Sequence, residues 1–347
     1  MKRLLLLGVF CMVLLGTVCF AEQQVCGSWT PAMVGGPVAQ GNDLLAVRWI
    51  EGPNMELTYN GQIILLSAYF YRGPDFPNMT VDPKEVKKAN AIFLGHGHGD
   101  HMLQAAQIAK QTGAKIYAQA ITIDLLKKAG EVPAGQLVTV KDGDVINFKG
   151  FKVEAVHAYH SGKDKPGDGE RQYDQITSPE VAAAFGPFFM AMIKRSAEQE
   201  KWEANNPYRV SPASQTSKDM ENDTFAYLFT FAGDFRFFYH DSSNYAITKQ
   251  MKDLMAKIKN TDVASIAYAG TPARYAAPWN MPETKLLNPR YVIPNHHYPA
   301  YEMDLIPYAV EIRRQISGSS LLPLMPNQVA CFNVKNHKLM LEGIILP

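Results

Sequence analysis

The seven-residue stretch Gly-His-Gly-His-Gly-Asp-His, residues 95–101, constrains this chain more than any other feature. It follows an apolar run at residues 91–94, which predicts a short buried strand, and it leads into residues 101–113, whose apolar spacing predicts a helix. Histidines two positions apart do not share one helix face, whereas a glycine-containing loop lets several side chains converge on one point. Imidazole and carboxylate ligands suit Zn²⁺ and similar divalent ions. The stretch therefore predicts a metal site between a strand and a helix.

Strand and helix signals alternate around this loop, which predicts a mixed α/β domain (α+β in some schemes). Residues 44–71 alternate apolar and polar side chains around Asn60-Gly61, the pattern of a β-hairpin. Asp82-Pro83 is typical of a helix start and predicts a helix over residues 83–90. Further strands are predicted over residues 114–120, 224–234, 262–270 and 289–297, further helices over 121–130 and 244–260, and short strands in the tail.

The amino terminus predicts export. Residues 1–21 combine a basic start, a long apolar stretch and a small residue at the end, as secretory signal peptides do. We therefore expect a periplasmic or extracellular protein, or a membrane-anchored one if the segment is not cleaved. Residues 22–43 form a lead, and residues 44–347 form the main domain.

An insertion at about residues 161–223 interrupts the strand and helix pattern of the main domain. Residues 178–200 within it predict a helix that is apolar nearly all round its middle. This composition favours burial against the domain or against a second copy of the chain, with membrane contact or a hydrophobic substrate as alternatives.

Charge argues against nucleic acid as a partner. The formal net charge is +1, and removal of Lys2 and Arg3 with the signal leaves 32 basic against 33 acidic residues. Because no basic excess exists to attract phosphates, a small-molecule substrate is expected.

Two cysteines remain after removal of the signal segment. Cys26 and Cys331 lie near opposite ends of the mature chain. An oxidising compartment would permit a disulfide between them, and the alternative is two separate thiols.

The loop at residues 95–101 also resembles a known signature. His96-x-His98-x-Asp100-His101 is similar to the H-x-H-x-D-H motif of the metallo-β-lactamase superfamily, and the resemblance covers residues 44–345 apart from the insertion. It implies a four-layer αββα sandwich with one or two metal ions at the ends of the inner strands. Within the superfamily, the motifs resemble most closely the ascorbate-6-phosphate lactonase-like branch.

The same resemblance implies three later metal ligands. A motif similar to A-x-H-S selects His160, with His157 as the alternative. A motif similar to A-G-D selects Asp234 as the residue that bridges two ions. A motif similar to V-I-P-x-H selects His296, with His297 as the alternative.

The implied ligand set predicts hydrolytic chemistry. One ion would bind His96, His98 and His160, the other would bind Asp100, His101 and His296, and Asp234 would lie between them. Zinc is the expected ion, with manganese or iron as alternatives. Such ions lower the pKa of a bound water from 15.7 towards about 7, which predicts attack on an ester, lactone or phosphodiester. Asp100 is the candidate to accept or pass on a proton.

The chain also departs from the superfamily pattern. Many relatives carry Gly-His after the first strand and Asp-Pro after the third, where this sequence has Glu51-Gly52 and Ser67-Ala68. Two other functions stay open: an iron-dependent sulfur or oxygen redox enzyme of the same fold, and a non-catalytic binding protein that retains the metal.

Overall fold

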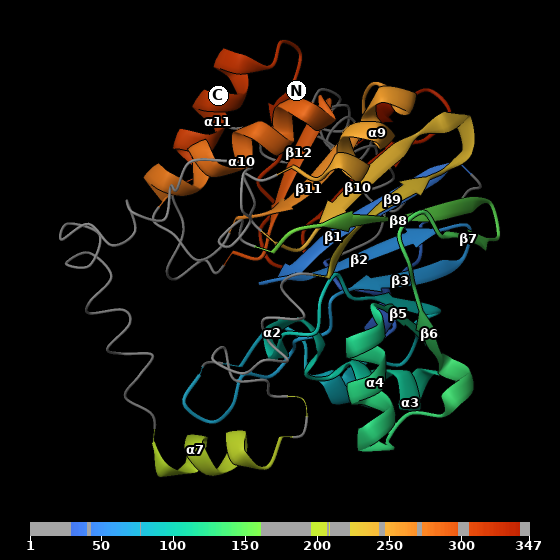
Figure 1. Cartoon of the computed structure of the whole chain (residues 1–347), viewed down its shortest axis with the longest axis vertical. Helices are drawn as coiled ribbons and strands as arrows, with labels where there is room; N and C mark the ends of the chain where they lie inside the picture. Colours follow the sequence, from blue (N-terminus) through green and yellow to red (C-terminus); the bar gives the residue numbers. More distant parts are fainter. Residues whose placement is uncertain are drawn as a thin grey trace, which may run out of the picture.

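A computed structural model of the chain describes residues 29–39, 43–76, 78–160, 196–206, 208, 223–242, 247–268, 273–297 and 305–340. Two β-sheets lie face to face in the middle of the molecule, and helices cover the outer face of each sheet (Figure 1). The predicted αββα sandwich and mixed α/β class are confirmed. The predicted signal segment lies outside the described residues. Among the helices that are described, none is long and apolar enough to cross a membrane.

The first sheet has eight strands in the order β15-β14-β1-β2-β3-β4-β5-β6. The strands are β1 (Leu44–Glu51), β2 (Asn54–Tyr59), β3 (Gln62–Leu66), β4 (Ala91–Phe93), β5 (Lys115–Ala118), β6 (Leu137–Thr139), β14 (Val329–Asn333) and β15 (Lys338–Leu339). The predicted hairpin joins β2 to β3, and both turn residues, Asn60 and Gly61, have positive φ angles of 50° and 77°. These angles explain why the turn uses Asn-Gly.

The second sheet has seven strands in the order β13-β12-β11-β10-β9-β8-β7. The strands are β7 (Val145–Phe148), β8 (Phe151–Ala158), β9 (Thr224–Thr230), β10 (Arg236–His240), β11 (Val263–Ala267), β12 (Tyr291–Asn295) and β13 (Ser320–Leu321). The sequence did not predict β10 as a separate strand. The chain turns at η4 (Ala232–Asp234), a short 3-10 turn, and returns antiparallel to β9.

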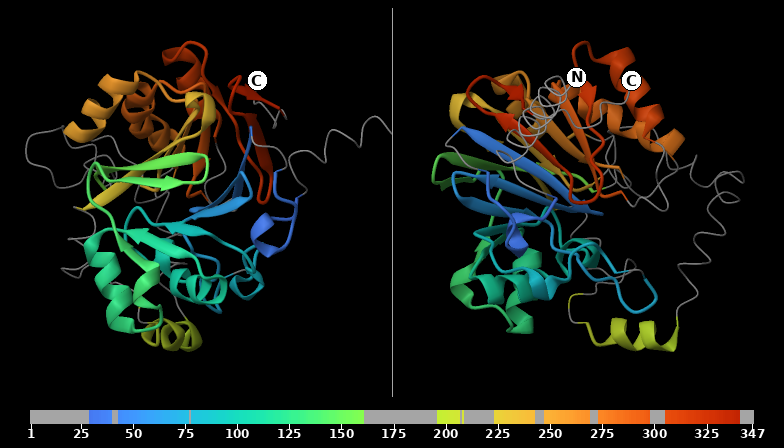
Figure 2. Two further views of the ribbon diagram at one scale, coloured as in Figure 1. Left: turned by 90° about the vertical axis from the view of Figure 1, so that its right-hand side faces the viewer. Right: turned by 180° about the vertical axis from the view of Figure 1, so that it is seen from behind.

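Helices pack on both outer faces (Figure 2). Those on the first sheet are α2 (Gly99–Met102), α3 (Ala105–Thr112) and α4 (Ala120–Ala129). Those on the second sheet are α9 (Lys249–Ile258), α10 (Ala273–Leu287) and α11 (Ile306–Gln315). Short 3-10 turns occur at η1 (Ala32–Val34), η2 (Pro83–Glu85) and η3 (Ala134–Gln136).

The predicted helix over residues 83–90 was wrong. The Asp82 side chain does accept a hydrogen bond from the Lys84 backbone N–H at 2.8 Å, as an N-cap would. The turn nevertheless ends at Val86, which is extended, because the next two backbone N–H groups bind the carbonyl of Met33. Contact with the N-terminal lead thus replaces helical hydrogen bonds.

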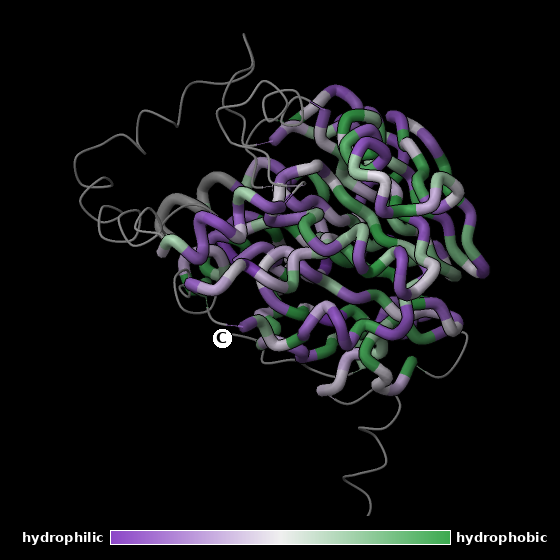
Figure 3. The backbone as a smooth tube through the Cα atoms, turned by 90° about the horizontal axis from the view of Figure 1, so that it is seen from below, coloured by the Kyte–Doolittle hydropathy of each residue, from purple (hydrophilic) through white to green (hydrophobic). Residues whose placement is uncertain are grey.

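The main core lies between the two sheets and consists largely of aromatic side chains. Phe93 of β4 stacks with Tyr117 at a centroid distance of 4.8 Å and contacts Phe229 of β9 edge-on at 5.4 Å. Hydrophobic segments of the backbone run through these middle layers (Figure 3). The apolar contact across the layers holds the strand ends of both sheets at fixed positions.

A buried ion pair attaches the N-terminal lead to the first sheet. Glu56 of β2 lies 3.3 Å from Arg48 of β1, and both side chains are almost fully buried. Glu56 also accepts the backbone N–H groups of Ala32 and Met33 at 3.0 and 2.7 Å. Burial, the largest influence, raises the pKa of Glu56, against the opposing effects of Arg48 and these two hydrogen bonds.

Only parts of the predicted insertion are described. Helix α7 (Ala197–Ala204) begins at Ser196, whose backbone N–H donates to Asp75 at 2.7 Å. The buried Gln199 side chain donates to the Arg72 carbonyl at 3.1 Å, so α7 is attached to the loop that follows β3. The rest of the predicted apolar helix at residues 178–200 lies outside the described residues.

Cys331 of β14 is buried and disulfide-bonded. Its partner is not among the described residues, which also exclude Cys26. The pairing of Cys331 with Cys26 stays a prediction.

Candidate metal centre

The candidate site lies at one edge of the sandwich, where strands from both sheets end. The loop after β4 carries His96 and His98, and His160 comes two residues after the end of β8. Asp241 follows β10 directly, and His296 follows β12 directly. Because these strand ends meet at the same edge, side chains from distant parts of the sequence converge there.

Three groups of candidate ligands form one connected cluster. The groups are His96, His98 and His160; His96, His101 and Asp241; and Asp100, His101 and His296. Within each group the ligand atoms lie within 4.8 Å of one another. His96 belongs to the first two groups and His101 to the last two, so the groups are continuous in space.

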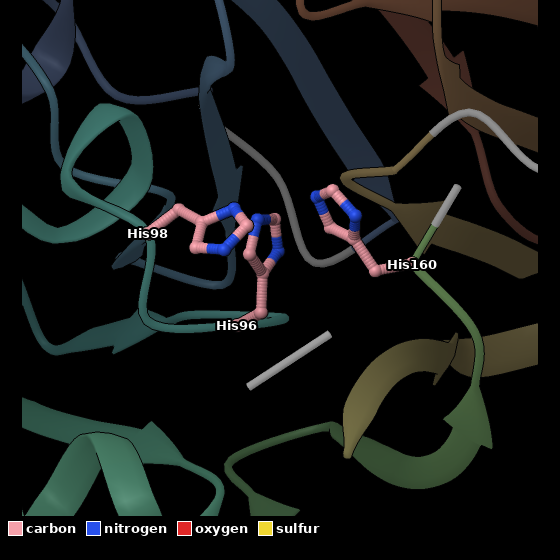
Figure 4. Close-up of side chains that lie close together, drawn as sticks. All are labelled: His96, His98 and His160. Atoms are coloured by element: carbon pink, nitrogen blue, oxygen red, sulfur yellow. The ribbon is translucent and has the colours of Figure 1, made fainter. Parts of the chain in front are cut away.

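The first group has nearly equal spacing between its three imidazoles. The centroid of the His96 ring lies 4.6 Å from that of His98 and 4.5 Å from that of His160, and the His98 and His160 centroids are 4.7 Å apart. The rings of His96 and His98 face that of His160 across a small gap (Figure 4). Three nitrogens so arranged match the protein ligands of an ion that keeps a further coordination position open.

The hydrogen-bond contacts of the two His96 ring nitrogens indicate that a metal ion fits here. His96 is fully buried, and its Nδ1 lies 3.0 Å from Asp241 Oδ1. Its Nε2 is buried and has no hydrogen-bond partner among the described residues. A buried polar atom without a partner is costly, and coordination by a divalent ion would satisfy it.

The group of Asp100, His101 and His296, called the second ligand group from here on, is held by stacking and a short contact. The imidazoles of His101 and His296 stack with centroids 4.6 Å apart and planes inclined by 16°. His296 Nε2 lies 3.1 Å from Asp100 Oδ2, and His101 Nε2 lies 3.9 Å from the same oxygen. The structure therefore brings these three predicted ligands together.

The two alternative histidines lie outside the three ligand groups of the described chain. His157 is within β8, where its backbone N–H donates to Asp142 Oδ1 at 2.8 Å. His297 is buried and stacks on Trp49 with ring centroids 4.0 Å apart. In each pair the structure places the preferred residue, His160 or His296, in the cluster.

The prediction of Asp234 as the bridging residue was wrong. Asp234 lies in the turn before β10, its side chain is 63% exposed, and it forms an ion pair with Arg236. Asp241, at the other end of the five-residue strand β10, is fully buried in the cluster. A strand rises about 3.3 Å per residue, so the two aspartates are separated by on the order of 20 Å.

Asp241 connects the loop after β4 to the second ligand group. Its carboxylate accepts the Gly95 backbone N–H at 2.9 Å and lies 3.4 Å from His101 Nδ1. Sequence reasoning missed it because β10 was not recognised as a separate strand. The available signal was an aspartate directly after the short strand-like run Phe237–His240.

Electrostatics favour neutral histidines beside ionised carboxylates. Burial, and next the neighbouring His96, hold the pKa values of His101 and His160 well below the ordinary histidine value. Burial opposes ionisation of Asp100 and Asp241, but His101 and further histidine neighbours outweigh it and lower both pKa values. Neutral imidazole and ionised carboxylate are the forms that bind metals.

Two hydroxyl groups form a chain of contacts that ends at Nδ1 of His101. Ser67 Oγ lies 3.0 Å from His101 Nδ1 and 3.0 Å from the Tyr239 hydroxyl. Ser67 is fully buried and has a φ of 64°, unusual for a residue other than glycine. This contact arises at Ser67-Ala68, one of the two positions where the sequence departs from the superfamily pattern.

Part of the chain is similar to known proteins. Residues 64–178, which include the loop at 95–101 and His160, match the model of a β-lactamase superfamily domain. A UPF0173 metal-dependent hydrolase of Agrobacterium fabrum is 29% identical over 126 residues, 36% of this chain and 52% of that relative. One of Cupriavidus necator is 29% identical over 161 residues, 44% of this chain and 55% of that relative. These matches support a place for this chain in the metallo-β-lactamase superfamily.

Two solved hydrolase structures are similar to this chain in fold. Igni18, a metallo hydrolase from Ignicoccus hospitalis, has a TM-score of 0.53 at 14% identity and covers 83% of this chain and 98% of that one. An isothiocyanate hydrolase from Delia radicum gut bacteria has a TM-score of 0.52 at 13% identity, over 83% and 99% of the two chains. At these identities the likeness concerns the fold. The chain spans about half the length of the two curated relatives above. The assignment to the lactonase-like branch stays a prediction.

Proposed function

We propose that this member of the metallo-β-lactamase superfamily is a metal-dependent hydrolase. The observation that carries the proposal is the continuous ligand cluster, in which the buried Nε2 of His96 has no hydrogen-bond partner among the described residues. The names of the curated relatives, metal-dependent hydrolases, support it. The substrate class we propose is a small ester, lactone or phosphodiester.

The proposed ligand set is divided between two ions. One ion would bind His96, His98 and His160, the other would bind Asp100, His101 and His296, and Asp241 would lie between them. When bound, such ions lower the pKa of a coordinated water towards about 7 and stabilise charge on the attacked and leaving groups. We propose zinc, because the ligands are imidazole and carboxylate.

The chain's own residues orient this set. Asp241 Oδ1 accepts from His96 Nδ1, which leaves His96 Nε2 directed into the cluster. Ser67 Oγ contacts His101 Nδ1, which similarly leaves His101 Nε2 for the second group. Such contacts fix the tautomer and the ring orientation of ligating histidines. The Asp100 side chain is 41% exposed, so its ionised carboxylate can accept a proton from the site and pass it to solvent.

Export of the protein is part of the same proposal. The signal-like composition of residues 1–21 supports a periplasmic or extracellular location, with membrane anchoring as the alternative. Membrane contact or self-association through residues 178–200 also stays a proposal, supported by the apolar composition of that segment. A neutral overall charge supports a partner other than nucleic acid.

The experiment that tests the function combines metal content with turnover. Natively purified protein is analysed by mass spectrometry for metal per chain and assayed on lactones, p-nitrophenyl esters and bis-p-nitrophenyl phosphate. We expect about two zinc ions per chain and hydrolysis of at least one substrate class. His160→Ala should lose metal and turnover, whereas the matched control His157→Ala should keep both.

Other outcomes would contradict the proposal in different ways. Metal-loaded protein without turnover on the whole panel would indicate a binding protein. A single iron per chain with oxygen consumption would indicate the redox alternative. Equal loss in His157→Ala and His160→Ala would contradict the ligand assignment.

A further inference from the structure

The backbone of His296 is held in an unusual conformation by residues from the other sheet. Its φ is 55°, in the left-handed region that a residue other than glycine adopts at a cost. Its backbone N–H donates to the Gly52 carbonyl at 2.8 Å. This conformation turns the imidazole of His296 towards Asp100 Oδ2, 3.1 Å away, and onto the ring of His101. A ligand with this backbone needs support from its surroundings.

Trp49 provides that support through two contacts. Its indole Nε1–H donates to the same Gly52 carbonyl at 2.8 Å, so this one oxygen accepts hydrogen bonds from both Trp49 and His296. Its ring stacks on the imidazole of His297 with planes inclined by 17°. Trp49 is itself only 1% exposed and cannot shift without disturbing the core between the sheets.

A backbone bridge completes the connection. Gly52 and His297 pair as an antiparallel bridge between the end of β1 and the end of β12. The segment Gly52, His296 and His297 is therefore attached to the first sheet at three points: the bridge, the shared carbonyl and the stacked rings. None of these contacts involves the first ligand group, which consists of His96, His98 and His160.

We propose that Trp49 is the positioning residue of the second metal site. By holding the Gly52 carbonyl and the His297 ring, it keeps His296 directed at Asp100 and His101. Loss of the indole N–H should weaken metal binding to the group containing His296 and leave the group containing His160 unchanged. The inference rests on the two-metal part of the proposed function.

The test is a titration of chelator-treated full-length protein with Zn²⁺, in which calorimetry measures each binding step. His296→Ala identifies which binding step belongs to the second group. In Trp49→Phe, which keeps an aromatic ring for the stack but lacks the N–H, that step should weaken ten- to a hundredfold, the usual effect of removing an outer support of a ligand. The other step should stay within twofold of the unchanged protein.

Phe237→Leu is the matched control. Phe237 is fully buried in the same inter-sheet core and belongs to β10, away from the contacts of His296. It should leave both binding steps unchanged. Unchanged steps in folded Trp49→Phe, or an equal loss in Phe237→Leu, would overturn the proposal, the latter by showing that core packing alone is responsible.

A second measurement does not depend on the folding of a variant. During Zn²⁺ titration of ¹⁵N-labelled protein, the indole N–H resonance of Trp49, assigned through its contacts with His297, should shift with the step that His296→Ala removes. A resonance that does not move during that step would overturn the proposal. Protein that binds no ion at the His296 group contradicts the two-metal function as well, whereas two bound ions with unaffected Trp49 variants contradict this inference alone.

Discussion

Replacement of Gly95 by alanine should disrupt the metal centre from within. A Cβ atom at Gly95 would lie 2.3 Å from Asp241 Oδ1 and 2.6 Å from both Cγ and Oδ2 of the same side chain. Ordinary contacts of a Cβ atom begin at 3.4 Å, so the carboxylate would have to move by about 1 Å. Asp241 is fully buried and has little space for such a shift.

The cost of this shift follows from the contacts of Asp241. Its carboxylate accepts the Gly95 N–H at 2.9 Å and lies 3.0 Å from His96 Nδ1. A hydrogen bond to a charged group contributes about 1.5–3 kcal/mol, so loss of one or both should lower the free energy of unfolding by roughly 2–5 kcal/mol. Metal affinity should fall at least tenfold, because Asp241 both supports and belongs to the ligand cluster.

Urea unfolding of metal-free protein and metal content per chain measure these two effects. Gly135→Ala is the matched control, because a Cβ there meets no atom within 4 Å and needs no positive φ. Its unfolding free energy should change by less than about 0.5 kcal/mol. In an Asp241→Ala background the Gly95 substitution should cost little, since the clash is gone. Full metal content and near-unchanged stability in Gly95→Ala would refute the reasoning.

Three further predictions concern other parts of the described chain. Asp241→Asn should lower metal content and turnover by at least tenfold, whereas Asp234→Asn, in an exposed turn, should change neither; the reverse result in a metal assay would show that Asp234 rather than Asp241 supports the metal centre. Glu56→Gln should cost about 3–5 kcal/mol in urea unfolding because it leaves Arg48 buried without a charged partner, and a cost below about 1 kcal/mol would contradict that account. Burial, and next the nearby His296, lower the pKa of His297 to about 3, so the folded chain keeps this ring neutral while the unfolded chain, with a pKa near 6.5, takes up a proton. Metal-free protein should therefore lose stability as the pH falls from about 6.5 to 3, and His297→Phe should remove a part of this loss on the order of 4 kcal/mol; identical pH profiles for the two proteins would exclude the mechanism.

Short-range patterns were sufficient for the elements that neighbouring residues determine. The turn at Asn60-Gly61 follows from side chains that tolerate positive φ, and helix α4 ends at Gly130 with a φ of 69°. Helices α10 and α11 were missed. Pro278 and Pro282 weaken the helical signal of α10, but its Glu283 contacts His240 at 2.9 Å and its Thr284 bonds Tyr308 at 2.7 Å. Packing on the second sheet and on α11 therefore overrides local propensity.

The candidate ligands also fall into those that neighbouring residues predict and those that depend on tertiary packing. His96, His98, Asp100 and His101 are close in sequence, so a single loop brings them together and the motif alone predicts the site. The position of Asp241 depends on the turn that reverses the chain after β9. The three-residue motif that ends at Asp234 was misleading, because Asp234 lies in that turn, at the opposite end of β10 from Asp241.

By itself, the sequence predicted the resemblance to the superfamily, the layered α/β architecture and the loop that supplies most of one ligand cluster, because each depends on residues that are close along the chain. Only the tertiary structure brings His296 rather than His297, and His160 rather than His157, into the ligand cluster, and it places Asp234 away from that cluster. Those choices depend on which way a side chain points at the end of a strand, and this direction is set by contacts with the other sheet, such as the stacking of His297 on Trp49.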